Sequence, residues 1–131
     1  MGVKIFLILF LTLPIVLRIP IEDPKCTEFR TGKFALIGNP ISHNYIIERN
    51  DSLQVETDLT AGSVSKFKVT WVNECAYELT ILEGNEVIMN FYKDRTLSVR
   101  IIETFKDGYK FESQLKGIDS YVLTQTLRVV K

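Results

Sequence analysis

The chain has 131 residues, with 16 Lys and Arg balanced by 16 Asp and Glu, so its formal net charge is zero. A chain of this length is the size of one domain, and it has no basic cluster of the kind that binds a phosphate backbone. We therefore expect a single domain and no nucleic-acid partner.

An apolar run at residues 5–17 follows Lys4 near the start of the chain. It is shorter than the about twenty residues that a membrane-spanning helix needs, so we interpret residues 1–22 as a secretory signal. An uncleaved N-terminal anchor is the alternative, because no small-residue cleavage site follows. In both cases residues 26–131 are the β domain and lie outside the cytoplasm, in the periplasm or cell envelope. Only an uncleaved N-terminal segment would contact the membrane.

The β domain holds both cysteines of the chain, Cys26 and Cys75. An exported location permits disulfides, which predicts one bridge between them, and two separate buried thiols are the alternative. Two cysteines and the single His43, without close spacing, do not make a zinc site. We expect no metal and no cofactor.

The first predicted strand is an apolar run at residues 33–37, followed by a loop rich in Gly, Asn and Pro at 38–44. Two further strands are predicted at 45–49 and 53–58. In the latter, apolar and polar residues alternate, as in a strand with one solvent-facing side. Leu53, Val55 and Thr57 share one side, and Gln54, Glu56 and Asp58 share the side that we assign to solvent.

The clearest pair of strands is residues 63–82, where a tight turn at 73–75 predicts a hairpin. Alternation predicts that Trp71 and Tyr77 lie close together across this turn. An aromatic cross-strand pair of this kind contributes up to about 1 kcal/mol beyond a pair of small residues. The inward side chains of the two arms are predicted to be Phe67, Val69, Trp71, Tyr77, Leu79 and Ile81.

The segment 83–95 breaks the pattern, and we expect a loop with a short helical turn that packs Ile88, Met89 or Phe91 over an open end of the sheet. Alternation resumes at 96–105, and Asp107-Gly108 is a strong hairpin signal. The return strand is predicted at 109–115 and the last strand at 121–130. Their inward residues are predicted to be Leu97, Val99, Ile101, Tyr109, Phe111, Tyr121, Leu123, Leu127 and Val129.

Seven or eight strands joined by short turns, without a helix long enough to cover a sheet, predict an all-β fold. An antiparallel, up-and-down β-barrel, lipocalin-like by fold analogy, fits the sequential hairpins, and a β-sandwich is the alternative. We expect a core that includes Phe67, Val69, Trp71, Tyr77, Leu79, Val99, Phe111 and Leu123.

The stretches CTEFRTGKF, IIERNDSLQVE and TWVNECAYELTIL resemble a group of short exported bacterial β proteins of unknown function. Such chains sometimes carry the name DNA topoisomerase IV by misassignment, because topoisomerase chemistry would require a far longer and basic chain. The resemblance covers most of the β domain and implies its fold and its export, with no catalytic activity. It also implies cysteines at the positions of Cys26 and Cys75, which supports the bridge.

No residue pattern predicts catalysis, so we expect that the protein is not an enzyme. His43 follows Ser42 in a loop, but adjacent residues in an extended loop point apart, and catalytic partners are recognised by spatial arrangement. Glu103 falls on the apolar face of its strand, either at the barrel rim or paired with a partner such as Arg128. Gln125 is either a satisfied core amide or a polar group inside a pocket.

Eight-stranded barrels are just wide enough to be filled by side chains or to hold one small ligand. The bulky inward set favours filling, but binding of a small apolar ligand is the best single named function. Its site would consist of Trp71, Tyr77, Phe111 and Tyr121, with Gln125 or Glu103 as the polar group. The alternative is a non-enzymatic structural or interaction module of the cell envelope, which would dock a partner protein through an exposed apolar patch at 87–92.

Overall fold

The computed structural model describes residues 2, 14–16, 24–38, 43–118 and 121–131. The predicted signal or anchor at 1–22 therefore lies outside the described residues, apart from 2 and 14–16, and stays a prediction. Within the described ranges, none of the helices is long and apolar enough to cross a membrane.

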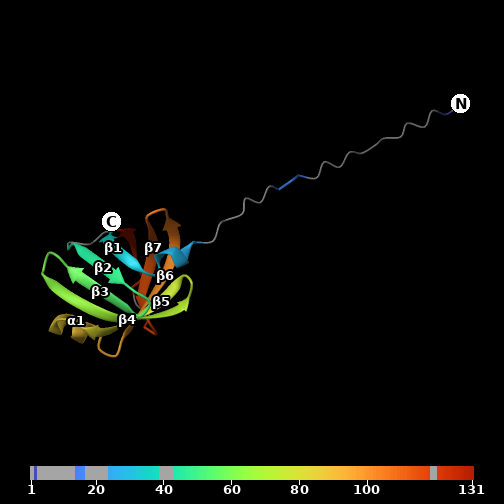
Figure 1. Ribbon diagram of the computed structural model, residues 1–131. Coiled ribbons are helices and arrows are strands. Elements are labelled where there is room, and N and C mark those ends of the chain that lie inside the picture. The colour runs from blue at the N-terminus through green and yellow to red at the C-terminus, as the bar shows by residue number, and fades with distance from the viewer. Residues whose placement is uncertain (1, 3–13, 17–23, 39–42, 119–120) are drawn as a thin grey trace.

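Eight antiparallel strands form one closed up-and-down barrel, in which each strand pairs with its neighbour in the chain and the first pairs with the last (Figure 1). The predicted all-β barrel is confirmed, and the sandwich alternative is wrong. The strands are β1 (Gly32–Ile37), β2 (Tyr45–Arg49), β3 (Leu53–Asp58), β4 (Ser63–Asn73), β5 (Ala76–Glu83), β6 (Thr96–Phe105), β7 (Gly108–Leu115) and β8 (Leu123–Val129).

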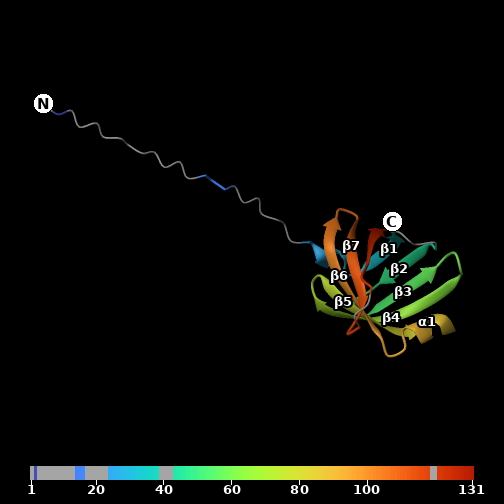
Figure 2. The same cartoon turned by 180° about the vertical axis from the view of Figure 1, so that it is seen from behind.

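Two short helices mark the two ends of the barrel. The 3-10 helix η1 (Cys26–Phe29) lies at the end that carries the turns β2–β3, β4–β5 and β6–β7, which we call the sealed end. The helix α1 (Glu86–Phe91) lies at the opposite end, the open end, as both views show (Figures 1 and 2). The barrel interior is therefore covered from one side by the N-terminal segment, and its other side carries the longer loops.

The predicted hairpin and disulfide are both confirmed. Trp71 pairs with Tyr77 across β4 and β5, and their ring centroids are 4.7 Å apart. Cys26 and Cys75 form a disulfide with a Cα–Cα distance of 5.2 Å. The bridge ties η1 to the β4–β5 turn and so holds the helix against the sealed end.

Most of the predicted core is buried, with two exceptions, Trp71 and Leu123, which are only half-buried. Two residues predicted to point inward are exposed at the ends of the last strand: Tyr121 is 86% exposed and Val129 is 42% exposed. The buried members of the predicted core are Phe67, Val69, Tyr77, Leu79, Val99 and Phe111.

The orientation that we assigned to β3 from its sequence is wrong, because its polar side faces the barrel interior. Gln54 is only 2% exposed, and it lies directly opposite Phe67, whose ring is buried in the core. Outward-facing Val55 instead lies opposite Lys66. The reason is the hairpin register: the loop 59–62 places Asp58 opposite Ser63, and the strict alternation of a strand then sets every other residue.

Glu103 also departs from its predicted position. A register shift between Ile101 and Glu103 interrupts the β6–β7 pairing, and Glu103 lies exposed opposite Lys110. An irregularity of this kind changes the face on which the following residues lie. Arg128, which we considered as a partner of Glu103, instead pairs with Asp107 at 2.9 Å.

Candidate ligand-binding cavity

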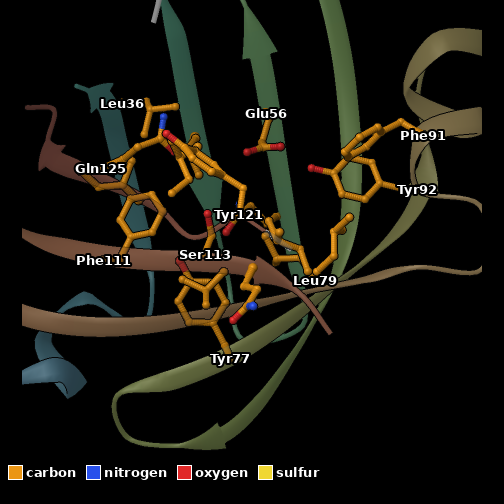
Figure 3. Close-up of a pocket in the computed structure, with 18 residues that line it drawn as sticks. Leu36, Glu56, Tyr77, Leu79, Phe91, Tyr92, Phe111, Ser113, Tyr121 and Gln125 are labelled. Atoms are coloured by element: carbon orange, nitrogen blue, oxygen red, sulfur yellow. The ribbon is translucent and has the colours of Figure 1, made fainter. Parts of the chain in front are cut away.

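The open half of the barrel holds a cavity of about 370 Å³ (Figure 3). Its walls come from the inward faces of strands on all sides of the barrel and from the end of α1. Most of the lining is apolar, aliphatic and aromatic side chains together, as expected for the interior of a barrel whose strands alternate between core and water. The aliphatic lining includes Leu36, Ile47, Leu79, Leu97, Val99 and Leu127.

Tyr77, Phe111, Tyr121 and Gln125, which the sequence assigned to a ligand site, all line this cavity. Trp71 does not line it. Its ring lies at the sealed end, with the Arg30 guanidinium 5.0 Å from the ring centroid, and its Nε1 has no hydrogen-bond partner among the described residues. The structure therefore brings together four of the six residues named from the sequence, because Glu103, the alternative polar group, is exposed and does not line the cavity either.

The sealed end contains a buried arginine, Arg49, which projects inward from the end of β2. Its guanidinium carbon lies 4.7 Å from the centroid of Tyr77 and 5.1 Å from that of Phe34. Arg49 donates hydrogen bonds to the carbonyls of Phe29 (2.7 Å) and Arg30 (3.1 Å), to Gln54 Oε1 (2.9 Å), and to the hydroxyls of Tyr77 (3.0 Å) and Tyr109 (2.8 Å).

These contacts keep Arg49 charged inside the protein. Burial alone would lower its pKa, but the hydroxyls of Tyr77 and Tyr109 raise the pKa above its ordinary value. Burial in turn raises the pKa of Tyr109 well above its usual range. Arg49 has five N–H donors, and the five contacts above use each of them. Its role at this end of the barrel is structural.

Glu56 is the acidic group of the cavity lining, two residues along β3 from Gln54. Burial raises the pKa of its carboxyl to about 7, against the opposing effects of a hydrogen bond from Gln54 and the charge of Arg49. Part of the side chain remains exposed because it faces the cavity. Gln54 therefore connects the buried Arg49 to the partly exposed Glu56, accepting from Arg49 and bonding to Glu56.

The helix α1 positions two aromatic residues at the mouth of the cavity. Asn85 caps the helix by accepting a hydrogen bond from the Ile88 amide at 2.9 Å, which sets the direction of the chain toward Phe91 and Tyr92. The Tyr92 ring packs edge-on against Phe67 at 5.3 Å. Its hydroxyl points toward Glu56 across the cavity (Figure 3), and burial, then the Glu56 charge, raises the pKa of Tyr92 to about 12.

His43 lies outside the cavity lining. Its Nδ1 is 2.6 Å from Asp58 Oδ2, and Asp58 also accepts hydrogen bonds from the amides of Thr60 and Ala61. The Ala61 amide, with His43, holds the pKa of Asp58 below its usual range. Ser42 lies outside the described residues. These contacts stabilise the β3–β4 turn, and His43 contributes one of them.

Sequence reasoning missed Arg49, Gln54, Glu56 and Tyr92 as interior groups. The inward orientation of Gln54 and Glu56 could have been predicted, because a four-residue loop after Asp58 places Gln54 opposite Phe67, which the sequence predicts to point inward. Nothing in the local pattern pointed to Tyr92, whose position depends on how α1 packs.

Neither the family models nor the curated proteins compared with the chain match it. The resemblance to short exported bacterial proteins stays a prediction.

Proposed function

We propose that this chain is an exported binding protein that holds one small, largely apolar molecule inside its barrel. The cavity carries the proposal, because about 370 Å³ exceeds the about 300 Å³ at the low end of small-molecule sites. The disulfide supports the location, since such bridges are typical of oxidising compartments outside the cytoplasm.

The composition of the lining supports an apolar ligand. Ligand sites combine mainly apolar walls with a few polar groups that fix orientation. Here the polar groups on the aliphatic and aromatic walls include Gln54, Glu56, Ser113 and Gln125. The proposal is binding alone and includes no catalytic step.

Binding is tested with prodan, an uncharged naphthalene dye whose emission shifts to the blue in apolar surroundings. We expect saturable binding with one dye per chain. Ser113→Phe fills the cavity from β7 and is expected to reduce dye affinity by at least about tenfold. The control Thr124→Phe adds a ring on the outer face of the adjacent strand β8, where Thr124 is exposed, and should leave affinity unchanged.

Circular dichroism checks that both variants keep the barrel. If neither prodan nor a panel of small apolar molecules binds saturably to the wild-type chain, ligand binding is wrong. Equal loss of binding in the Ser113 and Thr124 variants would place the dye on the surface instead of in the cavity.

A second function, an interaction module of the cell envelope, is favoured by the apolar side chains around the open end. Val87 of α1 is 75% exposed, and Met89, Phe91 and Leu59 are also exposed. A photo-crosslinking residue at Val87 would give a discrete adduct in intact cells if a partner docks here. The same residue at Thr124 is the control, and the same adducts at both positions would contradict specific docking.

A further inference from the structure

We propose that the ligand carries a protonated amine on an apolar body, and that the Glu56 carboxylate binds the amine inside the cavity. This inference rests on the proposed binding function. It deepens that proposal by assigning the chemical class of the ligand and the residue that selects it.

The charge of the cavity wall is the first observation. Among the described residues that line the cavity, Glu56 is the charged one, and none is Lys, Arg or His. A ligand cation therefore meets one opposite charge and no like charge on the wall. A ligand anion meets only the repulsion of Glu56 when this residue is ionised.

Arg49 weakens this preference without reversing it. Its charge acts on Glu56, but it lies at the sealed end and does not line the cavity. Its five N–H donors are used by protein acceptors, so no donor remains for a ligand carboxylate. Gln54 also stands between Arg49 and Glu56.

Glu56, in contrast, has unused acceptor capacity. A carboxylate can accept about four hydrogen bonds, and among the described residues Gln54 supplies the side-chain hydrogen bond to it. In Figure 3 the carboxylate projects into the space between β3 and the Tyr92 hydroxyl. An ammonium group in this space could donate to Glu56 and to the Tyr92 oxygen at the same time.

Aromatic rings add a second attraction for a cation. The lining contains the rings of Tyr77, Phe91, Tyr92, Phe111 and Tyr121. The face of an aromatic ring attracts an ammonium group, and aromatic cages are a known means of binding quaternary ammonium ligands. A site that combines aromatic rings with one carboxylate should bind an amine more tightly than an alcohol of the same size.

The affinity for an amine should depend on pH. Glu56 has a pKa of about 7, and the ionisable groups that face it are Arg49 and Tyr45 of β2 and Tyr92 after α1. Asp58, with its partner His43, follows on the same strand. The carboxylate is ionised above about pH 7, so amine binding should be strong there and weaken as the pH falls through this value.

The test compares octylamine, octanol and octanoate as competitors for prodan at about pH 8.5, where Glu56 is ionised and an alkylamine is still protonated. We expect octylamine to bind at least about tenfold more tightly than octanol, as a charged hydrogen bond implies. Glu56→Gln should remove this difference. Glu48→Gln is the matched control, because Glu48 is exposed on the outer face of β2, and it should keep the difference.

A second measurement does not depend on the variant. Octylamine affinity for the wild-type chain should fall at least about tenfold between about pH 8.5 and about pH 5.5, whereas octanol affinity should not change. If octylamine binds no better than octanol, or Glu56→Gln keeps the preference, the amine inference is wrong and the cavity proposal stands. If octanoate binds best, the amine inference is also wrong. If prodan does not bind, and direct titration shows no saturable binding of octylamine, octanol or the other small apolar molecules, both proposals fail.

Discussion

The sealed end and the open end of the barrel each contain an inward-facing charged side chain, on neighbouring strands and joined by Gln54. At the sealed end, Arg49 uses all its donors on carbonyl, amide and hydroxyl oxygens and lies against aromatic rings. At the open end, Glu56 faces a cavity, with one hydrogen bond from Gln54. Among the described residues, the same inward face thus holds one charged group whose donors are all used and one that faces a cavity.

This difference separates a structural group from a candidate functional group. A buried charge is costly unless it is paired and hydrogen-bonded, so the satisfied Arg49 contributes to the fold. Glu56 raises the free energy of the empty protein, and a ligand with a positive group would remove that cost. Residues that serve function commonly lower the stability of the folded protein.

The largest predicted effect belongs to the bridge that holds η1 on the sealed end. The cysteines are 49 residues apart, and removing a bridge over a loop of that length costs about 4 kcal/mol in the chain-entropy model. Urea unfolding of the Cys26→Ser, Cys75→Ser double variant measures this loss. A loss below about 1 kcal/mol would mean that η1 is held mainly by Arg49.

Arg49→Met is expected to cost about 3 kcal/mol or more, because the carbonyls of Phe29 and Arg30 and the Tyr109 hydroxyl lose a donor inside the barrel. Chemical denaturation of the purified variant gives the value. Arg30→Met serves as the control, since the Arg30 side chain forms an exposed ion pair with Asp51 and lies over the Trp71 ring, and losing these two surface contacts should cost about 1 kcal/mol. Equal losses in the two variants would contradict a special structural role for Arg49.

Glu56→Gln is predicted to stabilise the empty protein by about 2 kcal/mol above pH 7, a value reduced from the full pKa shift because the carboxylate faces the cavity. The pKa is raised from 4.5 to about 7 in the folded state. The folded state therefore binds the proton more tightly, and this stabilisation is present below pH 4.5 and is lost as the pH rises through about 7.

The measurement is the difference in unfolding free energy between wild type and Glu56→Gln across this pH range. The difference should be largest at high pH and small at low pH. A pH-independent difference would mean that Glu56 titrates normally, and the contrast between the two ends would then disappear.

Much of the fold follows from local patterns in the sequence. The bounds of β2, β3 and β6 agree with the predicted strands, because alternation and turn residues act over a few positions. The β4–β5 hairpin and its Trp71–Tyr77 pair were predicted for the same reason. The short helix α1 was also expected between β5 and β6.

The strands, the hairpins, the bridge as one of two alternatives, and Tyr77, Phe111, Tyr121 and Gln125 as candidate lining residues could all be predicted from local sequence patterns. The inward orientation of the polar side of β3 could not, because alternation shows which residues share a face but not which face is inside. That choice depends on registers between strands that are set when the barrel closes from β1 to β8. It is this closure that brings Arg49, Gln54 and Glu56 together and leaves the carboxylate facing a cavity.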